Sequence, residues 1–223
     1  RPVSSAASDV YKRQIEGSKW FLFKKGKLSH SHLELGGFVK SDKSYNHPNL
    51  QFHFFPYLVI NHGLENSKFE AFQFHVCPNR PKSRGFIKIK TNNYKDDPKI
   101  QFNYLKHKDD LKQMREGVKI AKHILSQKSL EEYVGVEIRP GKNVSNQTEL
   151  DEIIKNTSES AYHPSCTNKM GEDITSVVGQ SLKVHGIKNL RVVDASVMPD
   201  IVSANLNATT IMIAEKAYDQ IKS

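Results

Sequence analysis

The sequence predicts an α+β fold: an antiparallel-sheet domain with flanking helices, followed by the last strand and helix of a second, incomplete α/β domain. Three observations lead to this prediction. Short segments with alternating apolar and polar residues mark strands in the first half of the chain. Longer segments place apolar residues at helical spacing. A β-branched run at residues 190–193 is typical of a strand buried on both faces of a larger sheet.

The predicted strands of the first domain are residues 50–55, 69–76, 85–90 and 99–103. The second and third of these alternate clearly between apolar and polar side chains. Since they follow one another without the long helical crossovers that parallel strands need, we expect one antiparallel sheet.

A helix is predicted over residues 109–127, because one of its faces is apolar and would cover the sheet. That face consists of Leu111, Met114, Val118, Ala121 and Leu125. Thr148 with Asp151 three residues later resembles a capping box, which predicts a second helix ending near residue 157.

The last predicted helix begins after Asn205, which occupies the position of an N-cap residue. Its predicted apolar face consists of Leu206, Thr210, Ile213, Ala214, Ala217 and Ile221. The free amide hydrogens and dipole of such a helix start favour a phosphate, a carboxylate or another anionic group nearby.

Composition excludes several classes of protein. The 223 residues are 37% hydrophobic and 26% charged, which is typical of a soluble globular protein. Although the chain has 33 basic residues against 24 acidic ones, the lysines are scattered along the sequence, so we expect no nucleic-acid partner.

Cys77 and Cys166 fit no metal or disulfide pattern. No segment approaches the roughly 20 apolar residues that cross a bilayer, and residues 20–27 are interpreted as a core-packing helix end rather than a membrane-interface segment.

The chain is predicted to divide into three parts. Residues 1–14 show no helical or strand period and are expected to be a non-native, disordered segment outside the fold. Residues 15–158 form the predicted substrate-binding domain, and residues 159–223 form the end of the second domain. Because the sequence contains no Gly-x-Gly-x-x-Gly dinucleotide fingerprint, we expect it to be the C-terminal part of a longer protein.

Two polar motifs in the last part are the candidate active site. In the first, His163 precedes Pro164, which disfavours helical geometry and lets the imidazole project from a loop. An imidazole titrates near neutrality and can accept a proton from a hydroxyl. The alternative is a histidine that only pairs with a backbone carbonyl. In the second motif, Asn205 begins a helix that follows the small and polar residues 194–196, at the strand end where open sheets bind ligands.

The order and spacing of residues 160–171, 190–199 and 205–210 resemble the C-terminal end of the glucose-methanol-choline (GMC) flavin oxidoreductases. The resemblance covers residues 17–222 and is nearest to choline-oxidising members of the family. It implies an FAD cofactor, with His163 and Asn205 as the catalytic pair over the flavin. From their position in this half, four residues are expected to face the cofactor, which are Asp194, Ala195, Asn207 and Thr209, and no metal site is expected.

For the substrate, the resemblance implies choline, whose quaternary ammonium requires aromatic faces and a carboxylate. Glu34 matches such a carboxylate, Tyr162 offers an aromatic ring, and His62 matches a residue that binds the substrate oxygen. The alternatives are an exposed strand-edge charge for Glu34 and an amphipathic residue at a domain seam for Tyr162.

The resemblance implies an enzyme that oxidises choline to betaine aldehyde by hydride transfer to flavin, inactive without its N-terminal FAD domain. Its implied partners are that domain and a peripheral membrane or respiratory-chain electron acceptor. The implied location is intracellular, in the bacterial cytoplasm, at the inner-membrane face or in the mitochondrion. The alternative is a non-catalytic remnant or binding module that lacks the flavin half.

Overall fold

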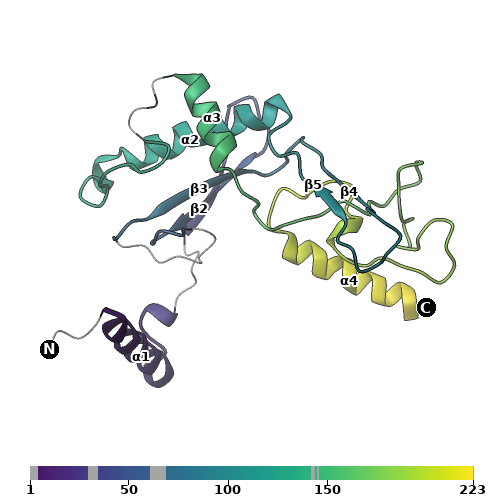
Figure 1. Cartoon of the computed structure of the whole chain (residues 1–223), viewed down its shortest axis with the longest axis horizontal. Helices are drawn as coiled ribbons and strands as arrows, with labels where there is room; N and C mark the ends of the chain where they lie inside the picture. Colours follow the sequence, from purple (N-terminus) through teal and green to yellow (C-terminus); the bar gives the residue numbers. More distant parts are fainter. Residues whose placement is uncertain (1–4, 30–34, 61–68, 142–143, 145, 223) are drawn as a thin grey trace. The chain divides into compact units, whose positions relative to one another are not determined.

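A computed structural model describes residues 5–29, 35–60, 69–141, 144 and 146–222 of the chain (Figure 1). The chain divides into two compact units. The first unit contains residues 1–37 and 52–75, and the second contains residues 38–51 and 76–223. Both helices and small sheets are present, which confirms the mixed class predicted from the sequence.

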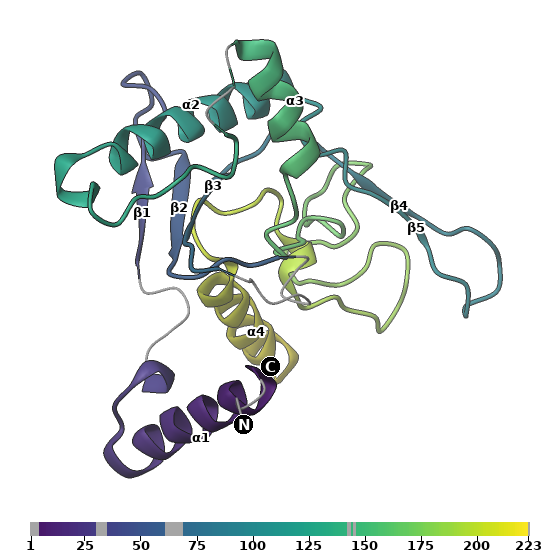
Figure 2. The same cartoon turned by 60° about the vertical axis from the view of Figure 1, so that its left-hand side comes forward.

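Two small sheets replace the single sheet that was predicted. One has three strands in the order β1 (Leu35–Val39), β2 (Leu50–Phe55) and β3 (Gln73–Pro78), which run side by side in Figure 2. The other is an antiparallel pair of β4 (Phe86–Lys88) and β5 (Lys99–Gln101). The prediction for β2 is confirmed in full, whereas β3 begins four residues later than predicted.

No strand was predicted at β1, because its two glycines have low strand propensity. The reason for one of them lies in the neighbouring strand. A Cβ atom at Gly36 would come within 2.8 Å of the backbone oxygen of Phe52 in β2. Within the same unit, the rings of Phe52 and Phe74 stack with centroids 4.9 Å apart. Close backbone approach and aromatic pairing therefore hold these strands together.

Helix α2 (Lys108–Leu125) confirms the predicted helix. Of its predicted apolar face only Ala121 is buried, and the other buried residues each lie one position before a predicted one. The buried residues are Asp110, Gln113, Gly117 and Ala121. A Cβ atom at Gly117 would come within 2.5 Å of the Val76 side chain and 3.3 Å of Leu50, so the glycine allows α2 to approach β2 and β3 closely.

Asn49, Asp110 and Gln113 form what we call the buried polar framework. Each is at most 6% exposed. Asp110 accepts hydrogen bonds from the backbone N–H groups of Lys82 and Ser83, both at 2.8 Å. Asn49 donates to the Gln113 carbonyl at 3.0 Å. These polar residues are buried because each finds a hydrogen-bond partner, which the hydrophobic pattern could not reveal.

Helix α3 (Gln147–Thr157) begins at a different cap from the predicted one. Asn146 is the N-cap, and its side chain accepts a hydrogen bond from the Glu149 N–H at 3.0 Å. Thr148 already lies in the first turn, so the predicted capping box of Thr148 and Asp151 is wrong. Asp151 instead accepts two hydrogen bonds from Arg115 of α2, at 2.9 and 2.8 Å. The Asp151 carboxylate is therefore engaged in a partly buried ion pair between α2 and α3 and does not cap the start of α3.

Helix α4 (Leu206–Lys222) confirms the predicted C-terminal helix. Leu206, Ile213 and Ala217 are buried as expected, whereas Ile221, assigned to the same face, is 59% exposed. Ala214 is exposed as well.

Residues 190–193 do not form the buried strand that was predicted. They make one antiparallel bridge, between Lys183 and Arg191, with Val192 N–H donating to the Leu182 oxygen at 3.1 Å. Val192 and Val193 are half-buried and pack on a local apolar core around Val178 and Val197. Within the described residues, a short local pairing is therefore found where a strand of a larger sheet was predicted.

Helix α1 (Ser5–Phe23) extends over residues 5–14, where the sequence showed no helical period, and the assignment of residues 1–14 to a non-native segment outside the fold stays a prediction. Residues 5–16 contain no glycine or proline and include alanine, lysine, arginine and glutamine, which favour helices.

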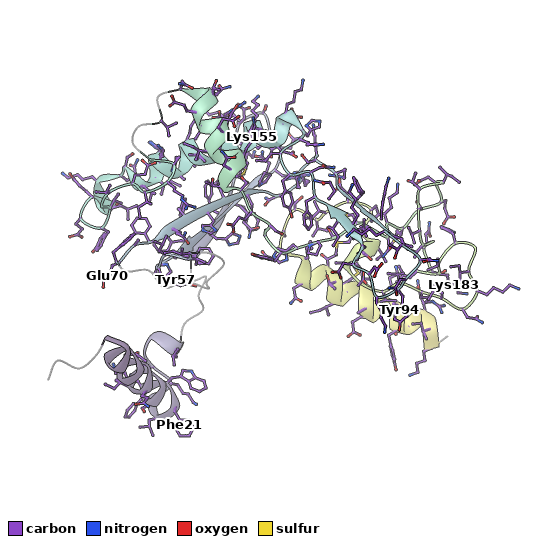
Figure 3. All side chains as sticks on the ribbon, in the orientation of Figure 1. Phe21, Tyr57, Glu70, Tyr94, Lys155 and Lys183 are labelled. Atoms are coloured by element: carbon purple, nitrogen blue, oxygen red, sulfur yellow. The ribbon has the colours of Figure 1, made fainter. Side chains whose placement is uncertain are left out.

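The end of α1 is also not the core-packing segment that was predicted. Phe21 is 72% exposed and extends from the helix surface (Figure 3), and Lys24 Nζ lies 4.3 Å from the Trp20 ring centroid. None of the helices described is both long and apolar enough to span a membrane.

Candidate active site

His163 lies in the loop of residues 160–165, which we call the His163 loop. It is exposed and outside any helix, as Pro164 predicts. Left-handed backbone conformations occur on both sides of it, at Tyr162 (φ 58°) and Cys166 (φ 70°). The Tyr162 N–H donates to Ser160 Oγ at 2.9 Å. Bulky residues seldom adopt positive φ values, and such strain is concentrated at functional sites.

The chain after the His163 loop is joined by backbone hydrogen bonds to residues 195–197, which precede the second motif. The short helix η4 (Ala195–Val197) supplies three carbonyl acceptors, which we call the η4 ladder. The N–H groups of Cys166, Asn168 and Met170 donate to the oxygens of Ala195, Ser196 and Val197, at 3.3, 2.9 and 2.8 Å respectively. The structure therefore brings together residues 166–170 and 195–197, two segments that the sequence assigned to one site.

Asp194 and Ala195, two of the predicted cofactor-binding residues, lie at the start of η4. The Asp194 carboxylate caps this helix, accepting from the Ser196 N–H at 2.8 Å and from the Ser196 hydroxyl. Ala195 is half-buried against the core below it. The position of Asp194 is thus fixed by local hydrogen bonds, and its contact with a cofactor stays a prediction.

Asn205 directly precedes α4, as predicted, and α4 packs on η4. The buried Leu206, 6% exposed, fixes the start of the helix. Asn207 is exposed and Thr209 is half-buried in the first turn. Small, exposed and polar groups at a helix start suit the polar edge of a flavin ring. These residues fit one side of an FAD site, although they do not form the dinucleotide-binding unit.

Gln51 is a site residue that sequence reasoning missed. Its Nε2 donates a hydrogen bond to Asn205 Oδ1 at 3.2 Å. Gln51 alternates with the buried Leu50 and Phe52 in β2, so its side chain points to the strand face opposite the core. That alternation was visible in the sequence, but the partner was not.

The segment after the η4 ladder is organised by Asp173. Its carboxylate accepts hydrogen bonds from Thr175, Ser176 and Lys169. Hydrogen bonding by Thr175 first, and then by Ser176 and Lys169, holds the pKa of Asp173 well below the usual aspartate range. Asp173 therefore carries a negative charge at all ordinary pH values and stabilises this turn.

The remaining predicted site residues are not assembled by the described structure. Tyr162 is 67% exposed. Glu34 and His62 lie outside the described residues. Within the described ranges there is no group of three or more His, Cys, Asp or Glu residues that could hold a metal ion.

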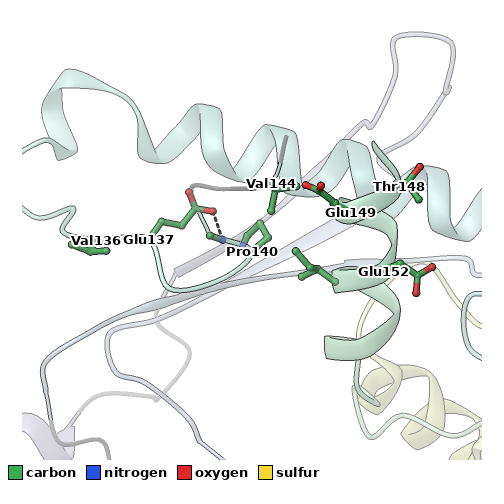
Figure 4. Close-up of a pocket in the computed structure, with 9 residues that line it drawn as sticks. Val136, Glu137, Pro140, Val144, Thr148, Glu149 and Glu152 are labelled. Atoms are coloured by element: carbon green, nitrogen blue, oxygen red, sulfur yellow. Dashed lines mark hydrogen bonds between the residues drawn. The ribbon is translucent and has the colours of Figure 1, made fainter. Parts of the chain in front are cut away.

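A cavity of about 740 Å³ lies away from these motifs, between residues 136–144 and the first turns of α3 (Figure 4). Its wall includes Glu137, whose carboxylate accepts from the Gly141 N–H at 3.1 Å. None of the predicted site residues lines it. The candidate active site is therefore defined by the two motifs and Gln51, not by this cavity.

Comparison with known proteins places these motifs in a family. The GMC oxidoreductase profile matches residues 81–214, which include His163, Asn205 and the η4 ladder. The chain belongs to the GMC oxidoreductase family, whose members use FAD.

Two relatives and one solved structure show how far the likeness extends. The chain is 43% identical over 223 residues to an oxygen-dependent choline dehydrogenase of Pseudomonas aeruginosa, covering 100% of this chain and 40% of that protein. It is 44% identical to the mitochondrial choline dehydrogenase of Homo sapiens, covering 100% of this chain and 38% of that protein. An Aspergillus oryzae formate oxidase, described for the modification of its FAD, has the same fold with a TM-score of 0.83 at 24% identity, over 95% of this chain and 41% of that one.

The chain thus spans about two fifths of the length of these curated relatives. The alignments also reach the first residues of the chain, whereas the sequence resemblance was expected to begin at residue 17.

Proposed function

We propose that the longer protein containing this chain is an FAD-dependent oxidoreductase that converts choline to betaine aldehyde. The observation that carries the proposal is the η4 ladder, which joins the continuation of the His163 loop to the short helix on which α4 packs. The ladder, together with the packing of α4 on η4, supports assigning the two motifs, which are some forty residues apart in the sequence, to one site. The choline dehydrogenases among the relatives support the choice of alcohol.

In this proposal His163 accepts the hydroxyl proton of the alcohol, because its exposed imidazole is carried on a strained, non-helical loop. Asn205 donates a hydrogen bond to the same oxygen and stabilises the negative charge that develops there. Bound FAD supplies the hydride acceptor. The protein's own contribution is to orient the alcohol and to hold its charge.

The substrate ammonium is assigned to Tyr162, whose exposed ring can face a cation, together with Glu34, and His62 is assigned to the substrate oxygen. The cofactor edge is assigned to Asp194, Ala195, Asn207 and Thr209. The proposed partner is an N-terminal FAD domain, which residues 159–223 complete, and electrons then pass to oxygen or to a respiratory-chain acceptor inside the cell.

The experiment is anaerobic reduction of the full-length flavoprotein by choline, followed by the loss of the visible absorbance of oxidised flavin. An uncharged alcohol of the same shape should reduce the flavin more slowly, because it lacks the ammonium. His163→Ala should slow reduction about a hundredfold or more. The matched control is His47→Ala, at an exposed histidine of the loop before β2.

If choline and related alcohols leave the flavin oxidised, or if His163→Ala and His47→Ala behave alike, the proposal is wrong. The first of these outcomes would favour a binding module that has lost its catalytic role.

A further inference from the structure

We propose that Gln51 is a positioning residue that fixes the orientation of the Asn205 side-chain amide, so that Nδ2 of Asn205 faces the substrate oxygen. The inference rests on the proposed function of Asn205 as the donor to that oxygen. It adds a residue from β2 to a site whose other members all lie at or beyond position 160 in the described chain.

The hydrogen bond itself provides the first argument. An asparagine amide has an oxygen that only accepts and a nitrogen that only donates, yet the two ends have nearly the same shape. A rotation by half a turn therefore exchanges donor and acceptor without changing the packing, and only hydrogen-bond partners select one orientation. Because Gln51 Nε2 donates to Asn205 Oδ1 at 3.2 Å, the oxygen of Asn205 is engaged and its Nδ2 is left to donate elsewhere.

The rigidity of both partners provides the second argument. Gln51 follows Leu50, which is completely buried against α2 at Gly117. One residue earlier, the Asn49 N–H donates to the Val39 oxygen at 3.0 Å, and the Asn49 side chain belongs to the buried polar framework.

The backbone of Asn205 is anchored through the next residue, Leu206, which is buried at the start of α4. A hydrogen bond between two such anchored elements can hold an amide within the narrow geometry that a catalytic donor requires.

The chemistry of the reaction provides the third argument. Removing a proton from an alcohol leaves negative charge on its oxygen. An N–H group directed at that oxygen stabilises the charge, whereas a carbonyl oxygen in the same place repels it. The orientation found in the structure, with Gln51 Nε2 donating to Asn205 Oδ1, is therefore the catalytically useful one.

The test reverses the polarity of this hydrogen bond. Gln51→Glu keeps the size of the side chain but offers only acceptors, so Asn205 must turn its Nδ2 toward the introduced carboxylate and its Oδ1 toward the substrate. In the full-length flavoprotein we expect kcat for choline to fall about a hundredfold, close to the loss from removing such a donor. KM should not rise, because the added negative charge attracts the quaternary ammonium.

A matched variant and a pH profile separate this effect from a structural one. Gln51→Met keeps the length without any hydrogen bond, so Asn205 can adopt either orientation and kcat should fall only about tenfold or less. For Gln51→Glu, activity relative to the wild type should recover as the pH falls and the introduced carboxyl gains a proton, because it can then donate. Flavin content and melting temperature of each variant show whether it is folded.

The deciding measurement repeats both substitutions in an Asn205→Ala background. We expect Gln51→Met to change kcat less than twofold there and Gln51→Glu to lose most of its hundredfold effect, because no amide remains to be oriented. If the losses are the same in both backgrounds while Asn205→Ala is itself impaired, Gln51 does not act through Asn205 and this inference alone is overturned. If Asn205→Ala is as active as the wild type, the proposed role of Asn205 fails and the inference fails with it.

Discussion

The buried polar framework and the His163 loop use polar residues in opposite ways. Asn49, Asp110 and Gln113 are almost completely buried and satisfied by hydrogen bonds to fixed partners. Tyr162 and His163 are exposed, and strained backbone holds the loop that carries them. The first arrangement stabilises the fold, whereas the second keeps side chains accessible to another molecule. Substitutions in the framework should therefore reduce stability, and those in the loop should reduce activity.

The largest effect is expected for Asp110→Ala. It removes the acceptor for the backbone N–H groups of Lys82 and Ser83 in a partly buried position and leaves both without this partner. We expect a loss of about 3 kcal/mol or more in the free energy of unfolding. Chemical denaturation and the melting temperature of the full-length protein measure it.

Asp109→Ala is the matched control for that variant. Asp109 is the adjacent residue of α2, and its carboxylate pairs with Lys82 at the surface. Its removal should change the melting temperature far less, because water replaces a surface ion pair readily. Equal losses for the two aspartates would contradict the distinction between the framework and the surface.

An effect on activity alone is expected for Tyr162→Gly. Glycine accepts the left-handed conformation found at residue 162, and this relief offsets its greater freedom in the unfolded chain. The free energy of unfolding should stay within about 1 kcal/mol of the wild type. Loss of the aromatic ring should raise KM for choline about threefold to fivefold.

Steady-state kinetics with choline and with an uncharged alcohol make this test specific. KM should rise for choline and stay unchanged for the uncharged alcohol, since only choline has a cation to place on the ring. A large loss of stability in Tyr162→Gly would instead assign the tyrosine to the fold.

The smallest effect is expected for the turn around Asp173. Because the folded pKa of Asp173 is lowered, its contribution to stability is present above the ordinary aspartate pKa and is lost as the pH falls through the folded value. Asp173→Asn should therefore open this turn at neutral pH and differ little from the wild type in strong acid. Hydrogen exchange of the Thr175 and Ser176 amides measures it.

Glu172→Gln provides the comparison for that variant, because Glu172 is the exposed neighbour of Asp173. It should leave the exchange of both amides unchanged at neutral pH. Faster exchange in both variants would show that net charge, rather than the hydrogen bonds of Asp173, holds the turn.

Sequence patterns predicted the helices and strands that are determined by neighbouring residues in the chain. The strand pattern identified β2 in full, and helical spacing identified α2 and α4 to within about one residue at their starts. The prediction for residues 190–193 was wrong because a β-branched run does not specify its partner. The predicted capping box at the start of α3 was wrong because Asp151 is bound by Arg115, which lies 36 positions earlier.

The candidate site divides in the same way. The proline after His163 was sufficient to place His163 outside a helix. The helix-forming segment after Asn205 was sufficient to place Asn205 at the start of one. Gln51 was missed because its partner is 154 positions away, and Asp110 was missed because the amides that it binds are 27 and 28 positions away. Long-range hydrogen bonds leave no periodic signal in a sequence.

The η4 ladder has a consequence for protein engineering. The three hydrogen bonds that join residues 166–170 to η4 are made by peptide groups, so they tolerate changes of side chain. At Asn168, substitution would remove only the added contact between its amide and Ser196 Oγ. Proline is excluded there, because it has no N–H to donate. A library that varies this position can therefore diversify the surroundings of the site while keeping the course of the main chain.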